Sequence, residues 1–132
     1  MLLVDTNVLV DVLQNDPQWA DWSIAQLRAQ ATLHALAINP VVYAEISLSF
    51  STLEALDEVV VTLGLEVCEI PRPALFLAAK AYAQYRRRGG SRQQVLPDFF
   101  IGAHAAVQGW PLLTRDARRF RTYFPTLDVV AP

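Results

Sequence analysis

Cysteine and long apolar runs are both scarce in this chain of 132 residues. The single cysteine, Cys68, excludes a disulfide within the chain, and its apolar neighbours are typical of a small core residue. No apolar run approaches the ~20 residues that a membrane helix needs, and the N-terminus MLLVDTNVLVD lacks the basic segment of a signal peptide. We therefore expect a cytoplasmic protein that does not enter a membrane.

A strong overall charge is also absent, because the formal net charge is −2, and this argues against a protein that coats nucleic acid. Residues 1–85 nevertheless hold ten acidic and three basic side chains, whereas residues 86–132 hold eight arginines and three acids. Each arginine cluster could bind phosphates or could lie at a solvated helix end. The clusters consist of Arg86, Arg87, Arg88 and Arg92, and of Arg115, Arg118, Arg119 and Arg121.

Short apolar runs alternate with amphipathic segments, which predicts a single α/β domain over residues 1–132. Because the expected connections contain helices, the strands should be parallel. Strands are predicted at 2–5, 33–39, 65–70, 111–114 and 127–130. Helices are predicted at 7–14, from Asp16-Pro17, after Asn39-Pro40, from the capping box at 51–54 to Gly64, and at 73–88, 97–108 and 115–120.

Two carboxylates, Asp5 and Asp116, come directly after predicted strands. Ligands of open parallel sheets bind beyond the carboxyl ends of the strands, so these two meet there if the first and fourth strands are neighbours. Asp98 lies in the first turn of a predicted helix, and Glu45 lies among apolar residues in another. Each aspartate alone could be a cap or turn residue, and the remaining acids, including Asp11, are interpreted as caps and solvated faces.

Several carboxylates that converge without basic partners repel one another, and a hard cation such as Mg²⁺ or Mn²⁺ removes that cost. A site of this kind supports hydrolysis of phosphodiester bonds by activating a water molecule. The sequence offers no persuasive covalent nucleophile, and both histidines, His34 and His104, are interpreted as buried or capping residues. The four acids therefore predict a metal-dependent hydrolase.

Four segments, LLVDTNVLVD, PVVYAEI, LPDFFIGAHA and PLLTRDARRF, together resemble the signature blocks of PIN-domain ribonucleases, and above all the VapC-type toxins of toxin–antitoxin pairs. The resemblance implies a three-layer PIN-like sandwich with a central parallel sheet of order 3-2-1-4-5, flanked by helices. It also implies an endoribonuclease in which Asp5, Glu45, Asp98 and Asp116 bind Mg²⁺ or Mn²⁺. Asn7 and Thr114 match polar positions that orient the acids or a water molecule.

The same resemblance implies an RNA substrate, an antitoxin protein as partner and a homodimer. The chain departs from the family one turn after Asp98, where Phe-Ile-Gly-Ala replaces a frequent further acid or polar residue. This departure leaves open whether one metal ion or two bind.

Two other interpretations remain. Haloacid-dehalogenase-like phosphatases also begin with a strand and an Asp-x-Asp motif, but here the second position is Asn7 and the only lysine is Lys80. A catalytically silent PIN-like module that only binds a partner is the stronger alternative. Such a protein would tolerate the loss of an acid, whereas all four acids are present in this chain.

Overall fold

The structure is a computed structural model that describes residues 1–91 and 95–132. Its centre is a parallel sheet with the strand order β3-β2-β1-β4-β5, as predicted. Leu3 in β1 pairs with Ala37 in β2 and with Leu112 in β4, so the first and fourth strands are neighbours. The strands are β1 (Leu2–Val4), β2 (Leu36–Ile38), β3 (Leu65–Val67), β4 (Leu112–Leu113) and β5 (Val129–Val130).

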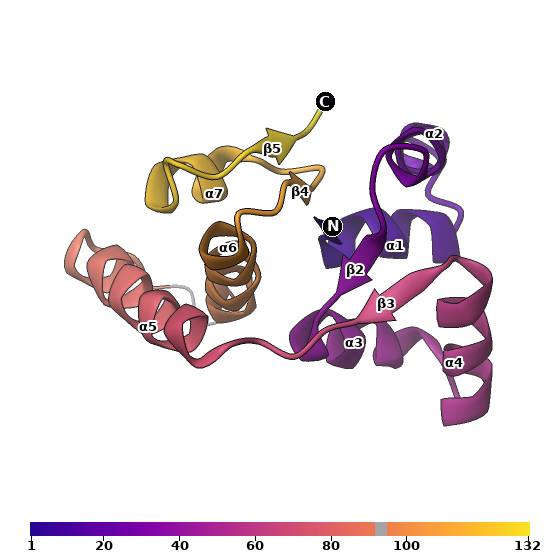
Figure 1. Cartoon of the computed structure of the whole chain (residues 1–132), viewed down its shortest axis with the longest axis horizontal. Helices are drawn as coiled ribbons and strands as arrows, with labels where there is room; N and C mark the ends of the chain where they lie inside the picture. The colour runs from indigo at the N-terminus through magenta and orange to yellow at the C-terminus, as the bar shows by residue number, and fades with distance from the viewer. Residues whose placement is uncertain (92–94) are drawn as a thin grey trace.

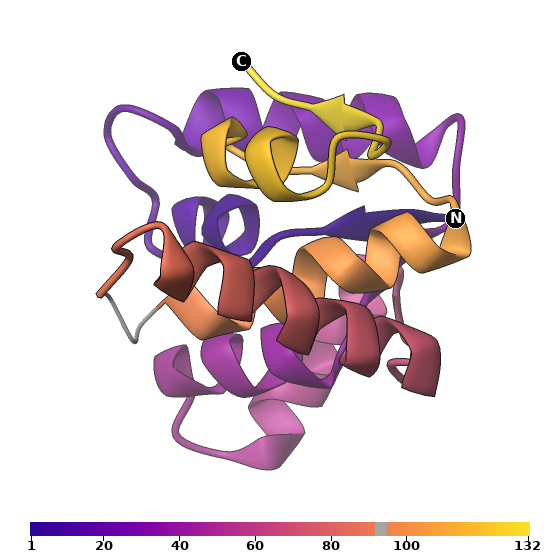
Figure 2. The same cartoon turned by 90° about the vertical axis from the view of Figure 1, so that its left-hand side faces the viewer.

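Helices cover both faces of the sheet and complete a three-layer arrangement. Figure 1 shows α5, α6 and α7 on one side of the strands and α1, α2 and α4 on the other, and in Figure 2 α5 and α6 run side by side. The helices are α1 (Thr6–Leu13), α2 (Ala20–Ala31), α3 (Pro40–Ile46), α4 (Leu53–Thr62), α5 (Arg72–Arg87), α6 (Leu96–Gln108) and α7 (Arg118–Tyr123), and a short 3-10 helix, η1 (Ser47–Ser49), follows α3.

Local sequence signals explain where several of these elements begin and end. The Asn39 side chain accepts a hydrogen bond from the backbone of Val42 and caps α3, whose first residue is Pro40. Gly109 ends α6 with a φ of +68°, a conformation that glycine adopts without steric cost. Residues Leu2 to Val4 are fully buried, as expected of a strand covered on both faces.

Several predicted boundaries differ from the observed ones, including those of α2, β2 and α7. Asp16 accepts hydrogen bonds from the backbone of residues 18 and 19 and caps a turn, so that α2 begins only at Ala20. The second strand begins at Leu36, which leaves His34 in the connection before it. The last short helix begins at Arg118, and the backbone N–H groups of Arg115 and Asp116 donate instead to the side chains of Asn7 and Thr114 at the end of the sheet.

No helix in the described part of the chain combines the length and the apolar composition that crossing a membrane requires.

Candidate functional site

Asp5 lies at the carboxyl end of the sheet, between β1 and α1, and is only 4% exposed. Its Oδ1 accepts a hydrogen bond of 2.7 Å from the backbone N–H of Thr6, so that Asp5 caps α1. Its Oδ2 accepts a hydrogen bond of 2.7 Å from the hydroxyl group of Thr114. Because both oxygens are held, the Asp5 carboxylate has a fixed orientation.

The hydroxyl group of Thr114 connects the loop after β4 to α1. The side-chain amide of Asn7 donates to this oxygen at 3.4 Å, and the backbone N–H of Asp116 donates to it at 3.1 Å. The carbonyl oxygen of the Asn7 side chain accepts from the backbone N–H of Arg115 at 3.2 Å. These bonds bring both predicted supporting residues into the immediate surroundings of Asp5.

Glu45 faces the same end of the sheet from α3, where the hydroxyl group of Thr6 donates to its Oε1 at 2.7 Å. Thr6 therefore contacts two of the four predicted acids, since its backbone N–H also donates a hydrogen bond to the Asp5 side chain. The sequence analysis did not single out Thr6. Its position directly after a strand-end aspartate was a signal, but its partner is 39 positions away in the sequence.

Asp98 lies in the first turn of α6 and forms an ion pair with Arg119, whose Nη1 donates to Asp98 Oδ2 at 2.6 Å. Both side chains are about a third exposed or less, at 32% for Asp98 and 27% for Arg119. Asp116 is exposed in the loop between β4 and α7. The fourth carboxylate thus stands at the solvent side of the site.

Two of the four acids, Asp5 and Asp98, have raised pKa values. Burial raises the pKa of Asp5 from its ordinary value of 3.8 to about 7, and repulsion by Asp98 and, more weakly, by Glu45 adds to the rise. Burial also raises the pKa of Asp98, with further repulsion from Glu45 and Asp116, although Arg119 acts in the opposite direction. The end of the sheet therefore carries negative charge that its protein neighbours do not fully compensate.

A divalent cation suits this set of side chains. Within residues 1–91 and 95–132, no three Asp, Glu, His or Cys side chains are already close enough together to form a metal centre. The donors are nevertheless all carboxylate oxygens, which Mg²⁺ and Mn²⁺ prefer. The raised pKa values of Asp5 and Asp98 indicate a charge that a cation would neutralise. On the chemistry of the donors, the four acids fit such an ion.

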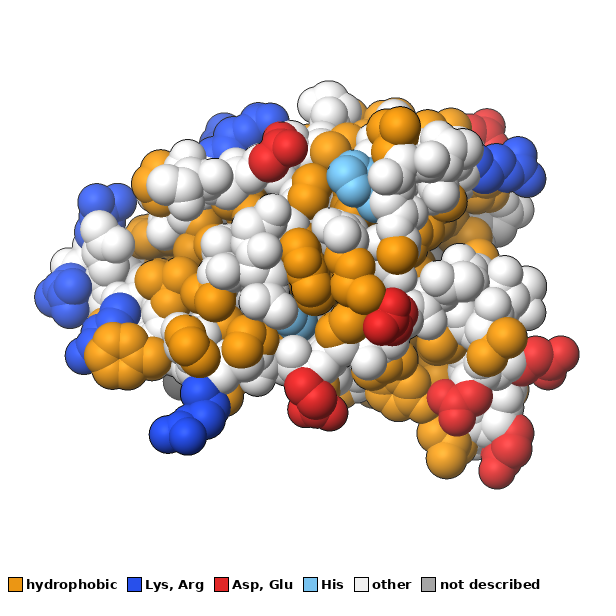
Figure 3. Space-filling model, viewed as in Figure 1, with side chains coloured by type: hydrophobic (Ala, Val, Ile, Leu, Met, Phe, Trp, Pro, Cys, Tyr) orange, Lys and Arg blue, Asp and Glu red, His pale blue; other side chains and the backbone are white. Residues whose placement is uncertain are grey.

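The predicted phosphate-binding arginines have different surroundings. Arg86 and Arg87 end α5, and Arg88 caps its C-terminus and lies 5.6 Å from the centre of the Tyr123 ring. Arg118 is exposed at the start of α7, and Arg92 lies outside the described residues. Figure 3 shows basic side chains gathered at the edge formed by α5 and α7, and acidic ones over α4.

Arg115 belongs to a partly buried network that the sequence analysis missed. Its Nε donates to Oδ2 of Asp11 at 2.9 Å, and its guanidinium group lies 5.4 Å from the centre of the Trp19 ring. Asp11 is only 2% exposed, and the same oxygen accepts a bond of 2.9 Å from Ser23. The interpretation of Asp11 as a cap or a solvated residue was therefore wrong, because its partners come from α2 and from the loop after β4.

His104 is a core residue, as the sequence analysis expected. It is fully buried on α6, where its Nδ1 lies 3.3 Å from the side-chain amide of Asn39 and its ring lies 5.2 Å from that of Trp110. Its Nε2 has no hydrogen-bond partner among the described residues. Burial lowers the pKa of His104, so the neutral ring is the favoured form in the fold.

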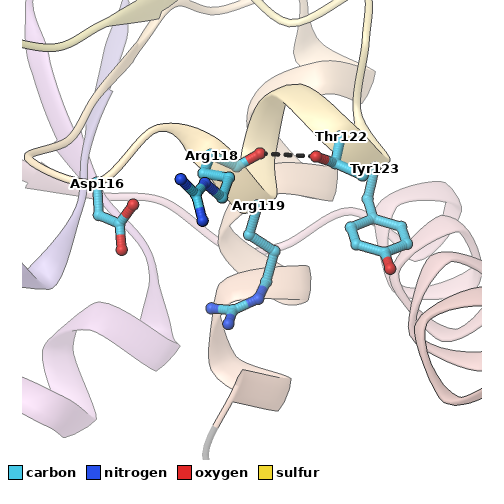
Figure 4. Close-up of a pocket in the computed structure, with 5 residues that line it drawn as sticks. All are labelled: Asp116, Arg118, Arg119, Thr122 and Tyr123. Atoms are coloured by element: carbon cyan, nitrogen blue, oxygen red, sulfur yellow. Dashed lines mark hydrogen bonds between the residues drawn. The ribbon is translucent and has the colours of Figure 1, made fainter. Parts of the chain in front are cut away.

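A cavity of about 410 Å³ opens beside Asp116. It is lined by Asp116, Arg118, Arg119, Thr122 and Tyr123, and four of these five residues belong to α7. In Figure 4, Arg118 extends toward Asp116, whereas Arg119 and Tyr123 project from α7 in a common direction. The cavity therefore lies between Asp116 and the side chains of α7.

Comparisons with known proteins agree with this architecture. The family model described as PIN domain matches residues 2–124. The structure of VapBC2 from Rickettsia felis, bound to a DNA fragment from its promoter, is similar at a TM-score of 0.74 and 19% identity, covering 98% of this chain and 97% of that chain. DNA-bound VapBC from Salmonella typhimurium has a TM-score of 0.71 and 21% identity, covering 98% and 96%.

A third similar structure is FitAcB from Neisseria gonorrhoeae, with a TM-score of 0.70 and 20% identity, covering 98% of this chain and 96% of that chain. At these identities the likeness shows the fold. A search of curated proteins found no match.

Proposed function

Because the chain belongs to the PIN domain family, whose members are generally nucleases, we propose that it is a metal-dependent endoribonuclease and the toxin of a toxin–antitoxin pair. The observation that carries this proposal is the gathering of carboxylates at the carboxyl end of the sheet. Burial and the charges of Asp98 and Glu45 raise the pKa of Asp5 there, and burial and the charges of Glu45 and Asp116 raise the pKa of Asp98. A structural core has no need of such a cluster, whereas hydrolysis of a phosphodiester does.

In this proposal Asp5, Glu45, Asp98 and Asp116 hold Mg²⁺ or Mn²⁺. A bound divalent cation supplies Lewis-acid activation of water and charge neutralisation at a phosphate. The protein supplies the orientation of its carboxylates: Thr114 holds Asp5, and Thr6 holds Glu45. Such supporting hydrogen bonds keep ligands in place before the ion arrives.

Cations around the acids assist the approach of a polyanionic substrate. Arg119 lies against Asp98, and Arg118 stands at the mouth of the adjacent cavity. Arg86, Arg87 and Arg88 extend the positive charge along the end of α5, and Arg115 and Arg92 complete the set proposed to assist RNA binding. Their contribution should weaken as the salt concentration rises.

The proposed partners are an antitoxin protein and a second copy of the chain. The Rickettsia, Salmonella and Neisseria structures are toxin–antitoxin complexes of similar fold, which supports the antitoxin. Large apolar side chains such as Leu48 and Phe76 are exposed, and this supports a surface that a protein partner covers. We place the activity in the cytoplasm, where its RNA substrates would be.

The test is cleavage of a structured RNA by the purified protein with Mg²⁺ or Mn²⁺, with EDTA as one control. Asp98→Asn removes one negative charge from the site, and we expect it to lower the cleavage rate about 100-fold or more, equivalent to about 2.7 kcal/mol. Asp128→Asn is the matched control, because Asp128 is exposed and lies just before β5, at the opposite end of the sheet. Circular dichroism establishes that both variants are folded.

Loss of cleavage in EDTA and in Asp98→Asn, with full activity in Asp128→Asn, supports the nuclease. If the folded wild-type protein cuts none of several RNAs with either metal, a catalytically silent module that binds a partner becomes the better interpretation.

A further inference from the structure

We infer that Asn39 and His104 form a buried link between α3 and α6 that holds Glu45 in position relative to Asp98. The inference rests on the proposed function, since it concerns the placement of two proposed metal ligands. The side-chain nitrogen of Asn39 and Nδ1 of His104 are 3.3 Å apart, and both residues are fully buried. Both residues act through other side chains, so they are positioning residues and not ligands.

The hydrogen bond of the link has a defined direction. Oδ1 of Asn39 already accepts a hydrogen bond of 3.0 Å from the backbone N–H of Val42, and this bond caps α3. The amide nitrogen that then faces His104 can only donate. Nδ1 of His104 is therefore the acceptor, and in the neutral ring the proton is on Nε2.

Packing alone does not explain a histidine at this position. Nε2 of His104 carries its proton into the core, and no described residue accepts it. An unsatisfied buried donor is costly, and an apolar side chain of similar size could pack against the Trp110 ring without that cost. An apolar side chain would, however, leave the amide of Asn39 without an acceptor. The distinctive contribution of the imidazole is thus the acceptor nitrogen that it presents to Asn39.

The two ends of the link belong to the two helices that carry Glu45 and Asp98. Asn39 is the N-cap of α3, a helix of only seven residues that includes Glu45. His104 follows Asp98 on α6, a little under two helical turns further along. Because α3 packs against α6, a rotation of α3 on that contact would move Glu45 relative to Asp98. A directional hydrogen bond opposes such a rotation, whereas apolar contacts alone have no preferred direction.

Two substitutions of His104 separate the hydrogen bond from packing. His104→Asn keeps an acceptor near the place of Nδ1 but leaves part of the space empty, whereas His104→Leu fills the space and has no acceptor. The probe is Mn²⁺ alone, with its binding to the full chain measured by electron paramagnetic resonance. We expect the affinity to be about tenfold lower in His104→Leu and close to that of the wild type in His104→Asn. A role in packing alone predicts the opposite order.

Asn39→Ser tests the link from its other end. Serine caps a helix about as well as asparagine does, so α3 keeps its cap while the bond to His104 is lost. We expect the same loss of about tenfold in Mn²⁺ affinity, and no further loss when His104→Leu is added. Val60→Ala is the matched control, because Val60 is buried in α4, outside both linked helices, and its truncation lowers stability without removing a polar contact.

Two measurements without any metal ion test the link itself. Nuclear magnetic resonance of the ring nitrogens should show His104 protonated at Nε2 and unprotonated at Nδ1 in the wild type. Residual dipolar couplings should give α3 the same orientation relative to α6 in the wild type and in His104→Asn, and a different one in His104→Leu.

A proton on Nδ1, an unchanged orientation in His104→Leu, or a lower Mn²⁺ affinity in His104→Asn than in His104→Leu would each overturn the inference. A loss of affinity in Val60→Ala equal to that in Asn39→Ser would do the same, because it would trace the effect to stability. If the orientations change as expected but the wild type binds no Mn²⁺, the proposed metal site fails and the link between α3 and α6 remains.

Discussion

A double-mutant cycle on Asp11 and Arg115 tests whether the partly buried network stabilises the loop that carries Thr114 and Asp116. The Arg115 Nε and an Asp11 oxygen are 2.9 Å apart, with Asp11 2% exposed and Arg115 32% exposed. Breaking a fully buried pair by removing one partner costs about 3–5 kcal/mol. The two single variants should differ, because only one of the two partners can reach water.

Asp11→Ala leaves a guanidinium group that is partly hydrated already, together with the Ser23 hydroxyl without its acceptor. We expect it to lower the free energy of unfolding by about 2–3 kcal/mol, below the range for a fully buried pair. Arg115→Ala leaves a carboxylate that water cannot reach and also removes the contact with Trp19, so we expect about 3–4 kcal/mol. The double variant should be less destabilised than the sum by about 1–2 kcal/mol.

Urea unfolding at neutral pH, followed by circular dichroism, measures all three differences. Ser23→Ala is the control for the hydroxyl group alone, with an expected loss of about 1 kcal/mol. A coupling below about 0.5 kcal/mol, or an Arg115→Ala variant as stable as the wild type, would refute the reasoning that this ion pair is an energetic link between α1 and the loop after β4.

Three further predictions follow from the described contacts. Because the pKa of His104 is lowered from its ordinary value of 6.5, its own contribution to stability should be full above pH 6.5 and fall as the pH drops below it, whereas the raised pKa of Asp5 acts in the opposite direction; the stability of the wild type relative to His104→Gln should therefore decrease from pH 7 to pH 5 in urea titrations. Gly102 lies in α6, and Gly102→Ala places a methyl group 2.5 Å from the Phe124 ring. We expect this substitution to lower the free energy of unfolding by about 1–3 kcal/mol in the same assay, whereas no loss would mean that the ring shifts freely. Mg²⁺ at about 100 times its dissociation constant should stabilise the wild type by about 2.7 kcal/mol in thermal unfolding, and an equal gain in Asp98→Asn would contradict the assigned ligands.

The sheet could be predicted because its signals are local. Leu2 to Val4 and Leu112 to Leu113 are short apolar runs in which every residue is buried, and the segments between them read as helices. The place of Asp5 and Thr114 at the ends of neighbouring strands follows from that pattern together with the strand order. Glu45, an acid among apolar residues, was also visible in the sequence.

The partners of these residues could not be predicted, because they depend on contacts between distant segments. Asp11 and Arg115 are 104 positions apart, and nothing near Asp11 in the sequence distinguishes it from a solvated acid. Thr6 likewise donates a hydrogen bond to Glu45 only because α1 packs against α3. A local signal can also mislead: Asp16-Pro17 is a pattern typical of a helix start, but it forms a turn before α2.

The four acids differ in how tightly the protein holds them, and burial explains the order. A buried carboxylate must have its oxygens satisfied by protein groups, and Asp5 is held at both of them. Glu45 is held at one oxygen, and Asp98 is held by an arginine that is itself partly exposed. The Asp116 carboxylate accepts no hydrogen bond from any described residue and is exposed.

Restraint therefore decreases from β1 toward α7, which is the direction in which the cavity opens. An ion that binds all four acids would meet a fixed carboxylate at Asp5 and a more mobile one at Asp116. The side chains that have to move when the ion binds are then those that water already solvates. Arg119 stands at this boundary, since it touches Asp98 and lines the cavity. If a cation takes the place of Arg119 beside Asp98, Arg119 becomes available to a phosphate of the proposed substrate, so that charge neutralisation and substrate binding would be linked.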